Sequence, residues 1–153
     1  DIPFSQVVGH GMNGAELAKN RRLDDYFVQD LNVNPKLPLA DGRFEAVLVA
    51  VSVQYLQYPE AVFAEIQRVL TGDGVCIVSF SNRMFYQKAI AAWRDSDDRE
   101  HLRLVKSYFE QTAGFSPPQV IAKSANVPVF LQMLGMGYRD PFYAVIARKL
   151  TYP

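Results

Sequence analysis

"LPLADGRFEAVLVAVSVQYLQYPEAVFAEIQRVLTGDG", residues 37–74, is the stretch of sequence that decides the fold. Its segment 44–53 is apolar without alternation, which is typical of a strand covered on both faces in the middle of a parallel sheet. Pro59 then suits the first turn of a helix, whose apolar residues recur every three or four positions. Gly72 and Gly74 are expected to stop that helix. This succession of buried strand, amphipathic helix and turn predicts an α/β fold.

The rest of the chain repeats the alternation of strand and helix. Short strands are expected at residues 4–8, 26–31, 75–81, 119–125 and 141–150, and helices at residues 13–20, 83–93 and 97–113. This order predicts a Rossmann-like, doubly wound and mostly parallel sheet, whose last two strands form an antiparallel pair. No repeat or long linker interrupts the pattern, so residues 1–153 are expected to form a single domain.

The composition excludes several classes of protein. Sixteen basic residues balance sixteen acidic ones, so the net charge predicts neither a nucleic acid nor a membrane as a partner. The longest apolar run, residues 46–53, is far shorter than the roughly 18 residues that span a bilayer, and a cytoplasmic location is the default expectation. The single cysteine, Cys76, lies in an apolar run and is expected to be buried and inert.

A glycine motif lies near the start of the chain. "VVGHGMNG", residues 7–14, has the G-x-G-x-x-G spacing of a dinucleotide-binding turn. In that interpretation Asp30, 16 residues after Gly14, would hold the ribose of a nicotinamide or flavin nucleotide. The helix that follows the motif is unusually short for such a domain, which counts against this interpretation.

Two further motifs carry a resemblance to a known family. The first combines a Leu-Pro-apolar stretch, an Asp and a Phe-acidic pair, here Leu37, Pro38, Leu39, Asp41, Phe44 and Glu45. The second is "EIQRVLTGDG", residues 65–74, in which Asp73 stands where the family usually has a glycine. In this order around a buried strand and a helix, the motifs resemble those of the class I S-adenosylmethionine-dependent methyltransferases, the type 11 branch in particular. The resemblance implies S-adenosylmethionine (SAM) as cofactor and a small molecule as methyl acceptor.

The resemblance also gives a register for the glycine motif. An Asp at the end of the family's third strand corresponds to Asp30, so the strand that ends at Gly9 corresponds to the second. The position of the family's ribose-binding acid is then Gly11, and the hydrophobic residue that packs on adenine is Met12. Because Gly11 has no carboxylate, either Asn13 substitutes for it or the ribose is held weakly.

In this register the family's first strand, with its glycine-rich loop, would precede Asp1. The resemblance therefore implies an N-terminally incomplete methyltransferase fold that lacks a central strand of the sheet. Unpaired strand edges require partners, so we expect a homo-oligomer and weak or absent SAM binding.

The candidate site residues follow from the family's strand ends. The resemblance implies cofactor contacts by Gly9, Gly11, Met12, Asn13, Asp30, Leu31, Ala50, Val51 and Ser52, and substrate contacts by Gln54, Tyr55 and Asn82. Three of these residues have equally simple structural explanations. Asp30 could form a turn with Asn32, Tyr55 could belong to the core, and Asn82 could lie in a helix cap.

Other side chains are expected to be structural. Phe85, Tyr86 and Trp93 are expected in the core, His10 in solvent and His101 on a surface helix, and no residue spacing predicts a metal site. The Met-rich segment 127–138 suits a lid or an interface.

Methyl transfer mainly requires alignment of two reactants, so no catalytic residue can be assigned. A non-catalytic scaffold or oligomerisation domain is the alternative function.

Overall fold

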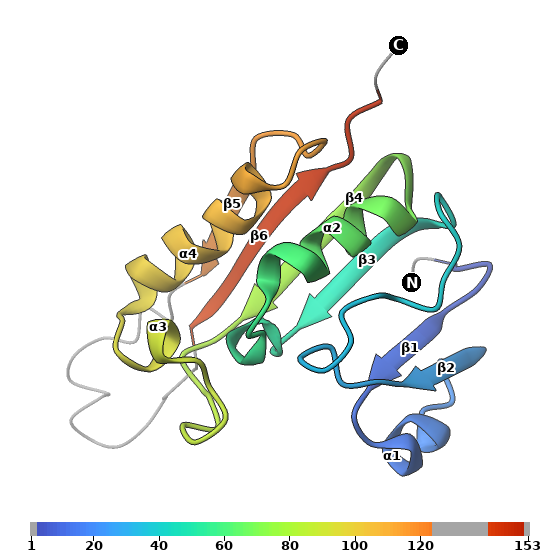
Figure 1. Ribbon diagram of the computed structural model, residues 1–153, viewed down its shortest axis with the longest axis horizontal. Helices are drawn as coiled ribbons and strands as arrows, with labels where there is room; N and C mark the ends of the chain where they lie inside the picture. Colours follow the sequence, from blue (N-terminus) through green and yellow to red (C-terminus); the bar gives the residue numbers. More distant parts are fainter. Residues whose placement is uncertain (1–2, 124–140, 152–153) are drawn as a thin grey trace.

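The computed structural model describes residues 3–123 and 141–151 (Figure 1). In chain order the elements are β1 (Val8–Gly11), α1 (Gly14–Lys19), β2 (Asp25–Val28), β3 (Phe44–Ala50), the 3-10 helix η1 (Val53–Tyr55), α2 (Pro59–Val69), β4 (Leu70–Phe80), α3 (Ala91–Arg94), α4 (Asp98–Gln111), β5 (Gln119–Lys123) and β6 (Phe142–Arg148). The Met-rich segment 127–138 lies outside the described residues.

Four strands form the larger sheet, in the order β3-β4-β6-β5. β3 and β4 are parallel and are joined by the crossover helix α2, as parallel neighbours require. β6 runs antiparallel to both β4 and β5. The α/β fold with a final antiparallel strand pair is therefore confirmed.

β1 and β2 form a separate two-stranded parallel sheet, in which Gly9 lies opposite Tyr26 and Gly11 opposite Val28. In Figure 1, β1 lies on the side of this pair that faces β3, and the arrows of β1 and β3 point the same way. Within the described ranges, no strand pairs with the free edge of β1 or of β3. The described strands thus form two half-sheets.

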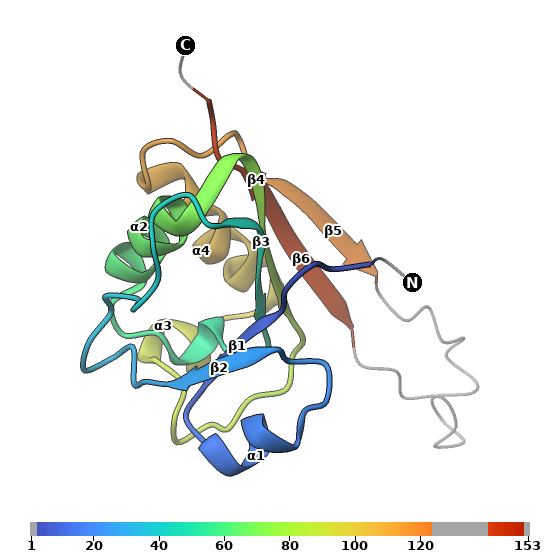
Figure 2. The same ribbon diagram turned by 90° about the vertical axis from the view of Figure 1, so that its right-hand side faces the viewer.

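The core lies between one face of the larger sheet and helices α2 and α4, which Figure 2 shows with the sheet nearly edge-on. Phe63 of α2 meets Phe109 of α4 in an edge-to-face contact with ring centroids 5.0 Å apart. Every described residue that is buried lies at Val53 or later in the chain. The half-sheet of β1 and β2 therefore contributes no buried residue.

The other face of the larger sheet is open at β3. Val47 and Val49 pack against the core, so Leu48 between them points to the opposite face, where it is 66% exposed. Leu48 pairs with Ile77 of β4, which pairs with Ile146 of β6, so an apolar row crosses three strands. The expectation that residues 44–53 are covered on both faces is wrong, because no described helix covers this side of β3.

The end of α2 also differs from the sequence expectation. Pro59 is the first helical residue, as predicted, but the helix ends at Val69 and β4 begins at the next residue, before Gly72. Asp73 has a φ of +61°, which favours glycine and explains why the related signature usually has glycine here. Its carboxylate accepts a 2.8 Å hydrogen bond from Thr151 Oγ1, which holds this turn against the end of the chain.

Three expectations for residues 83–109 are wrong. The helix expected at 83–93 is reduced to α3, and Phe85 and Tyr86 are exposed rather than in the core, although Trp93 is buried. α4 begins after a capping box formed by Asp97 and Glu100, but His101, expected on the surface of this helix, is buried. The His101 ring stacks on Trp93 with centroids 4.0 Å apart, and its Nε2 lies 2.8 Å from the Trp93 carbonyl oxygen.

Candidate functional site

A hydrogen-bonded connection joins the loops that follow β2 and β3. Asn32, after β2, donates from Nδ2 to the Tyr55 carbonyl oxygen at 3.0 Å and accepts from the Gln57 amide at 2.8 Å. These bonds hold the β2 loop against η1, at the edge of the sheets where parallel α/β folds bind ligands. Sequence reasoning missed this role of Asn32, because a contact across more than twenty residues leaves no local pattern.

Two glycines of the motif near the start of the chain, Gly9 and Gly11, lie in β1 rather than in a phosphate-binding loop, and Gly14 begins α1. Gly9 and Gly11 are both paired within β1, which lies at Val8–Gly11 rather than at the expected residues 4–8. A Cβ on Gly9 would lie 2.4 Å from Leu23 Cδ1, so packing explains this glycine. A Cβ on Gly11 would lie 3.5 Å from the Leu17 methyl groups, an ordinary contact. The dinucleotide-turn interpretation is therefore wrong, and position 11 has space for a side chain.

Met12 and Asn13 connect β1 to α1. Met12 is 66% exposed beside the end of the strand. Asn13 is the N-cap of α1, and its Oδ1 accepts hydrogen bonds from the amides of Ala15 and Glu16. The side-chain oxygen that could have replaced a ribose-binding carboxylate is therefore engaged with the helix.

Asp30 and Leu31 follow β2 and support the fold. One carboxylate oxygen of Asp30 accepts the Asn32 amide at 2.9 Å, and its carbonyl oxygen accepts the amides of Val33 and Asn34. Leu31 packs against the buried core of the larger sheet. These contacts join the loop after the smaller half-sheet to the core of the larger one.

The end of β3 has an unusual backbone conformation. Ala50 is its last residue and pairs with Ser79 of β4. Val51 has a φ of +49°, a region in which a β-branched residue is strained, and its amide donates to the Ser79 carbonyl oxygen at 2.8 Å. Ser52 follows as the exposed N-cap residue of η1 and makes no side-chain capping hydrogen bond.

Gln54 and Tyr55, in η1, differ in how their polar atoms are satisfied. Gln54 is fully buried, and neither its side-chain oxygen nor its nitrogen has a hydrogen-bond partner. Burial of a polar group without a hydrogen-bond partner costs free energy. A bound ligand could supply that partner, so Gln54 is a candidate ligand contact. The Tyr55 hydroxyl accepts the Phe85 amide at 2.9 Å.

Asn82 lies at an exposed bend after β4 and does not cap a helix, because no helix begins there. The Ser81 hydroxyl accepts the Arg83 amide instead. His10, expected in solvent, is exposed and places Nε2 2.8 Å from the Gln29 carbonyl oxygen.

The buried thiol of Cys76 is unsuited to nucleophilic catalysis. It is fully buried in β4, and burial raises its pKa to about 12. No set of three or more His, Cys, Asp or Glu side chains within residues 3–123 and 141–151 could hold a metal ion. None of the described helices is long and apolar enough to cross a membrane.

Residues 5–78 match the model of a family described as "Methyltransferase domain". This part of the chain is similar to that methyltransferase family. The match includes β1, β2, β3 and α2 and ends within β4, so it contains every candidate site residue except Asn82. A search of curated proteins finds no match to the chain.

Solved methyltransferase structures share the fold. A SAM-dependent methyltransferase from Thermotoga maritima is 19% identical, with a TM-score of 0.62 over 95% of this chain and 73% of its own. One from Mesorhizobium loti is 14% identical, with a TM-score of 0.60 over 95% of this chain and 81% of its own. SpnF, a [4+2]-cyclase, is 18% identical, with a TM-score of 0.62 over 96% of this chain and 67% of its own. At these identities the comparisons show a shared fold.

The two methyltransferase motifs meet in space around Arg68. Its guanidinium donates to Glu65 within α2, to Asp41, and to the carbonyl oxygens of Leu37 and Leu39. Glu65 also accepts the Leu37 amide at 2.7 Å. The hydrogen bond from Arg68 is the main cause that lowers the pKa of Glu65. These motifs therefore fix the chain before β3 onto α2, and their role is structural.

Proposed function

We propose that this chain is a SAM-dependent methyltransferase-like domain, similar to enzymes that transfer a methyl group to a small molecule, and that its own activity is weak or absent. The observation that carries the proposal is the family match over residues 5–78, which contains the loops that follow β1, β2 and β3. In this proposal the cofactor contacts are Gly9, Gly11, Met12, Asn13, Asp30, Leu31, Ala50, Val51 and Ser52. The acceptor contacts are Gln54, Tyr55 and Asn82. We further propose a single cytoplasmic domain that forms homo-oligomers.

The described residues fit the adenine end of SAM better than its ribose. Exposed Met12 is an apolar surface for adenine beside the end of β1. Gly11 supplies no carboxylate for the ribose hydroxyls, and the side-chain oxygen of Asn13 is engaged in capping α1. We therefore propose that this chain holds SAM weakly or not at all.

The chemistry asks little of the protein beyond positioning. SAM, when bound, supplies a methyl group on a sulfonium that a nucleophile can attack directly. Holding the acceptor in line with that methyl group supplies much of the rate. Gln54 lies in η1, after β3, and its buried side-chain amide has no hydrogen-bond partner. We propose that this amide orients the acceptor.

A non-catalytic scaffold is the second candidate function. The engagement of Asn13 and Asp30 in a helix cap and a turn supports it, because neither oxygen needs a ligand to be satisfied. The shared fold with a [4+2]-cyclase also shows that this architecture does not by itself define the reaction.

A matched pair of glycine substitutions distinguishes these functions. Calorimetric titration of the unchanged chain with SAM is expected to give a dissociation constant weaker than about 1 μM. Gly11→Asp restores a carboxylate where a Cβ has space, and is expected to tighten binding about tenfold through charge-assisted hydrogen bonds. Gly9→Asp is the control, because its Cβ would collide with Leu23 and it should give no gain.

Two results would overturn these proposals. Micromolar or tighter binding by the unchanged chain contradicts weak cofactor binding. Unchanged affinity in folded Gly11→Asp contradicts the placement of ribose at β1 and favours the scaffold function.

A further inference from the structure

The balanced total charge conceals a local excess of positive charge. Residues 74–94 contain no Asp or Glu but include Arg83, Lys88 and Arg94. The next acidic residue is Asp95. We call residues 81–94, which include the loop after β4 and helix α3, the cationic loop.

Four contacts hold the cationic loop in place. The Phe85 amide donates to the Tyr55 hydroxyl at 2.9 Å, and the Ile90 amide donates to the Gln54 carbonyl oxygen at 3.0 Å. Met84 packs against the core, and Ala89 is 5% exposed. The loop therefore has a defined conformation, fixed to η1 and the core.

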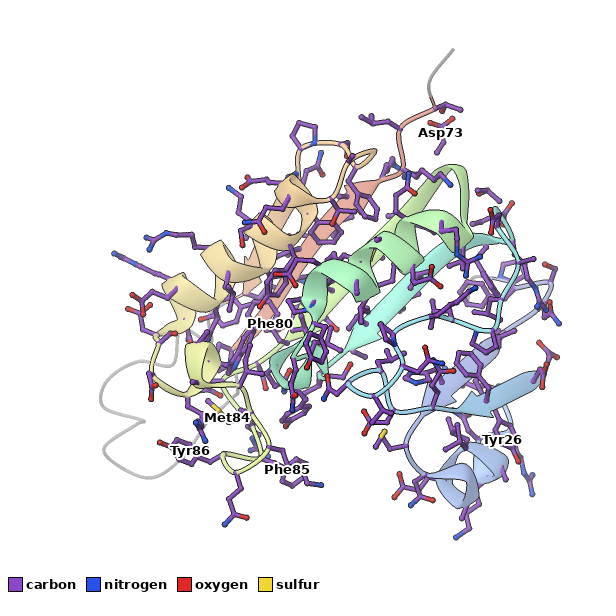
Figure 3. The ribbon with its side chains drawn as sticks, viewed as in Figure 1. Tyr26, Asp73, Phe80, Met84, Phe85 and Tyr86 are labelled. Atoms are coloured by element: carbon purple, nitrogen blue, oxygen red, sulfur yellow. The ribbon has the colours of Figure 1, made fainter. Side chains whose placement is uncertain are left out.

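Within this fixed loop, two aromatic side chains point outward. Phe85 is 71% exposed and Tyr86 is 62% exposed, and Figure 3 shows both at the outer edge of the molecule. A cation lies over each ring, with Lys88 Nζ 5.5 Å from the Phe85 centroid and Arg94 Cζ 5.5 Å from that of Tyr86. The apolar rings and the positive charges thus share one surface.

We propose that the cationic loop docks onto an anionic lipid surface. Aromatic rings are favoured at the headgroup level of a bilayer, and lysine and arginine beside them are attracted to anionic headgroups. A second copy of this surface is a poorer partner, since it presents the same positive charge. Asp95, Asp97 and Asp98 follow the cationic loop toward α4, and two of them have partners of their own, because Asp97 caps the helix and Asp98 accepts a hydrogen bond from Tyr143. This proposal does not depend on methyl transfer.

Cosedimentation of the full chain with lipid vesicles tests the proposal without any cofactor. The chain is expected to bind vesicles of phosphatidylcholine mixed with phosphatidylserine about tenfold more tightly than pure phosphatidylcholine, with a loss of binding as salt rises. Phe85→Ser should weaken binding about tenfold, and Lys88→Gln about fivefold.

Two matched controls lie outside the cationic loop. Val33→Ser changes a side chain that is 81% exposed after β2, and Lys106→Gln removes a surface lysine of α4, so both should leave vesicle binding unchanged. The proposal is overturned if the mixed vesicles bind no better than phosphatidylcholine, or if the controls lose as much binding as the loop variants. Self-association that Phe85→Ser abolishes in the absence of vesicles would also overturn it, by making a second copy the occupant.

Discussion

The two half-sheets of this protein are built from similar strand segments but differ in what covers them. Helices α2 and α4 cover one face of the larger sheet. Every buried residue in the described part of the chain lies at Val53 or later, in this sheet or in the segments packed against it. The pair of β1 and β2 has only the six-residue helix α1 and no buried residue. Because burial of apolar surface is the main stabilising term, the two regions should differ widely in stability.

This difference bears on function, because the proposed adenosine contacts belong to the less stable region. Gly9, Gly11 and Met12 lie in or beside β1, whereas Gln54 and Tyr55 follow β3 of the larger sheet. Ordering the smaller half-sheet around a cofactor would use part of the binding free energy. The proposed weak binding of SAM would then follow from packing as well as from the lack of a carboxylate at Gly11.

The sharpest contrast is expected from equivalent phenylalanine truncations in the two regions. Phe63→Ala removes a fully buried ring between α2 and α4 and should lower the free energy of unfolding by about 3–5 kcal/mol. Phe27→Ala in β2 removes a half-buried ring near His10 and should cost about 1 kcal/mol or less. Urea denaturation measures both, and equal losses would remove the proposed contrast between the half-sheets.

The Arg68 cluster should give a smaller, pH-dependent effect. Arg68→Ala breaks the attachment of Leu37 and Leu39 to α2 and should lower the free energy of unfolding at neutral pH by about 2 kcal/mol. Exposed Arg103→Ala on α4 is the control, with a change within about 0.5 kcal/mol.

The sign of the pH dependence follows from Glu65. Its pKa is lowered from the ordinary value of 4.5 in the folded protein, so its stabilising contribution is present above that value and is lost as the pH falls. The difference between wild type and Arg68→Ala should therefore shrink in acid unfolding measurements. A difference that stays constant below pH 4.5 would show that Glu65 is not the coupled partner.

The smallest expected effect is self-association through the uncovered side of the larger sheet. The apparent mass from light scattering should rise with protein concentration, because β3 has an unpaired edge and an exposed Leu48. Leu48→Lys should reduce the rise, whereas Val33→Lys, at an exposed position outside the sheets, should not. A constant monomer mass at high concentration would contradict the oligomer proposal.

Much of the larger sheet could be predicted from the sequence, because its apolar patterns are local. The segment that forms β3, the start of α2 at Pro59 and the antiparallel pair of β5 and β6 were all indicated by periodicity and turn residues. The exposure of Leu48 could not be predicted, since an apolar pattern does not show whether a covering element is present. The loop at residues 83–90 has helix-forming residues, but its tertiary bonds to η1 determine its conformation.

The candidate site was less predictable than the fold. The expected ends of the strands placed Asp30 and Gln54 in loops on the ligand-binding side of the sheet. This was possible because the apolar pattern of a strand shows where the strand ends. The engagement of Asn13 in a cap agrees with its position before a short helix, where asparagine is favoured. The bonds of Asn32 to Tyr55 and Gln57, and the missing partners of the Gln54 amide, depend on contacts between distant segments.

Hydrogen exchange measured by mass spectrometry tests the contrast between the half-sheets most directly. Peptides covering β1 and β2 should exchange at least about a thousandfold faster than peptides covering β4 and β6, whose amides open only with the whole fold. Equal protection of β1 and β6 in the free chain would contradict the claim that the smaller half-sheet lacks a stabilising core.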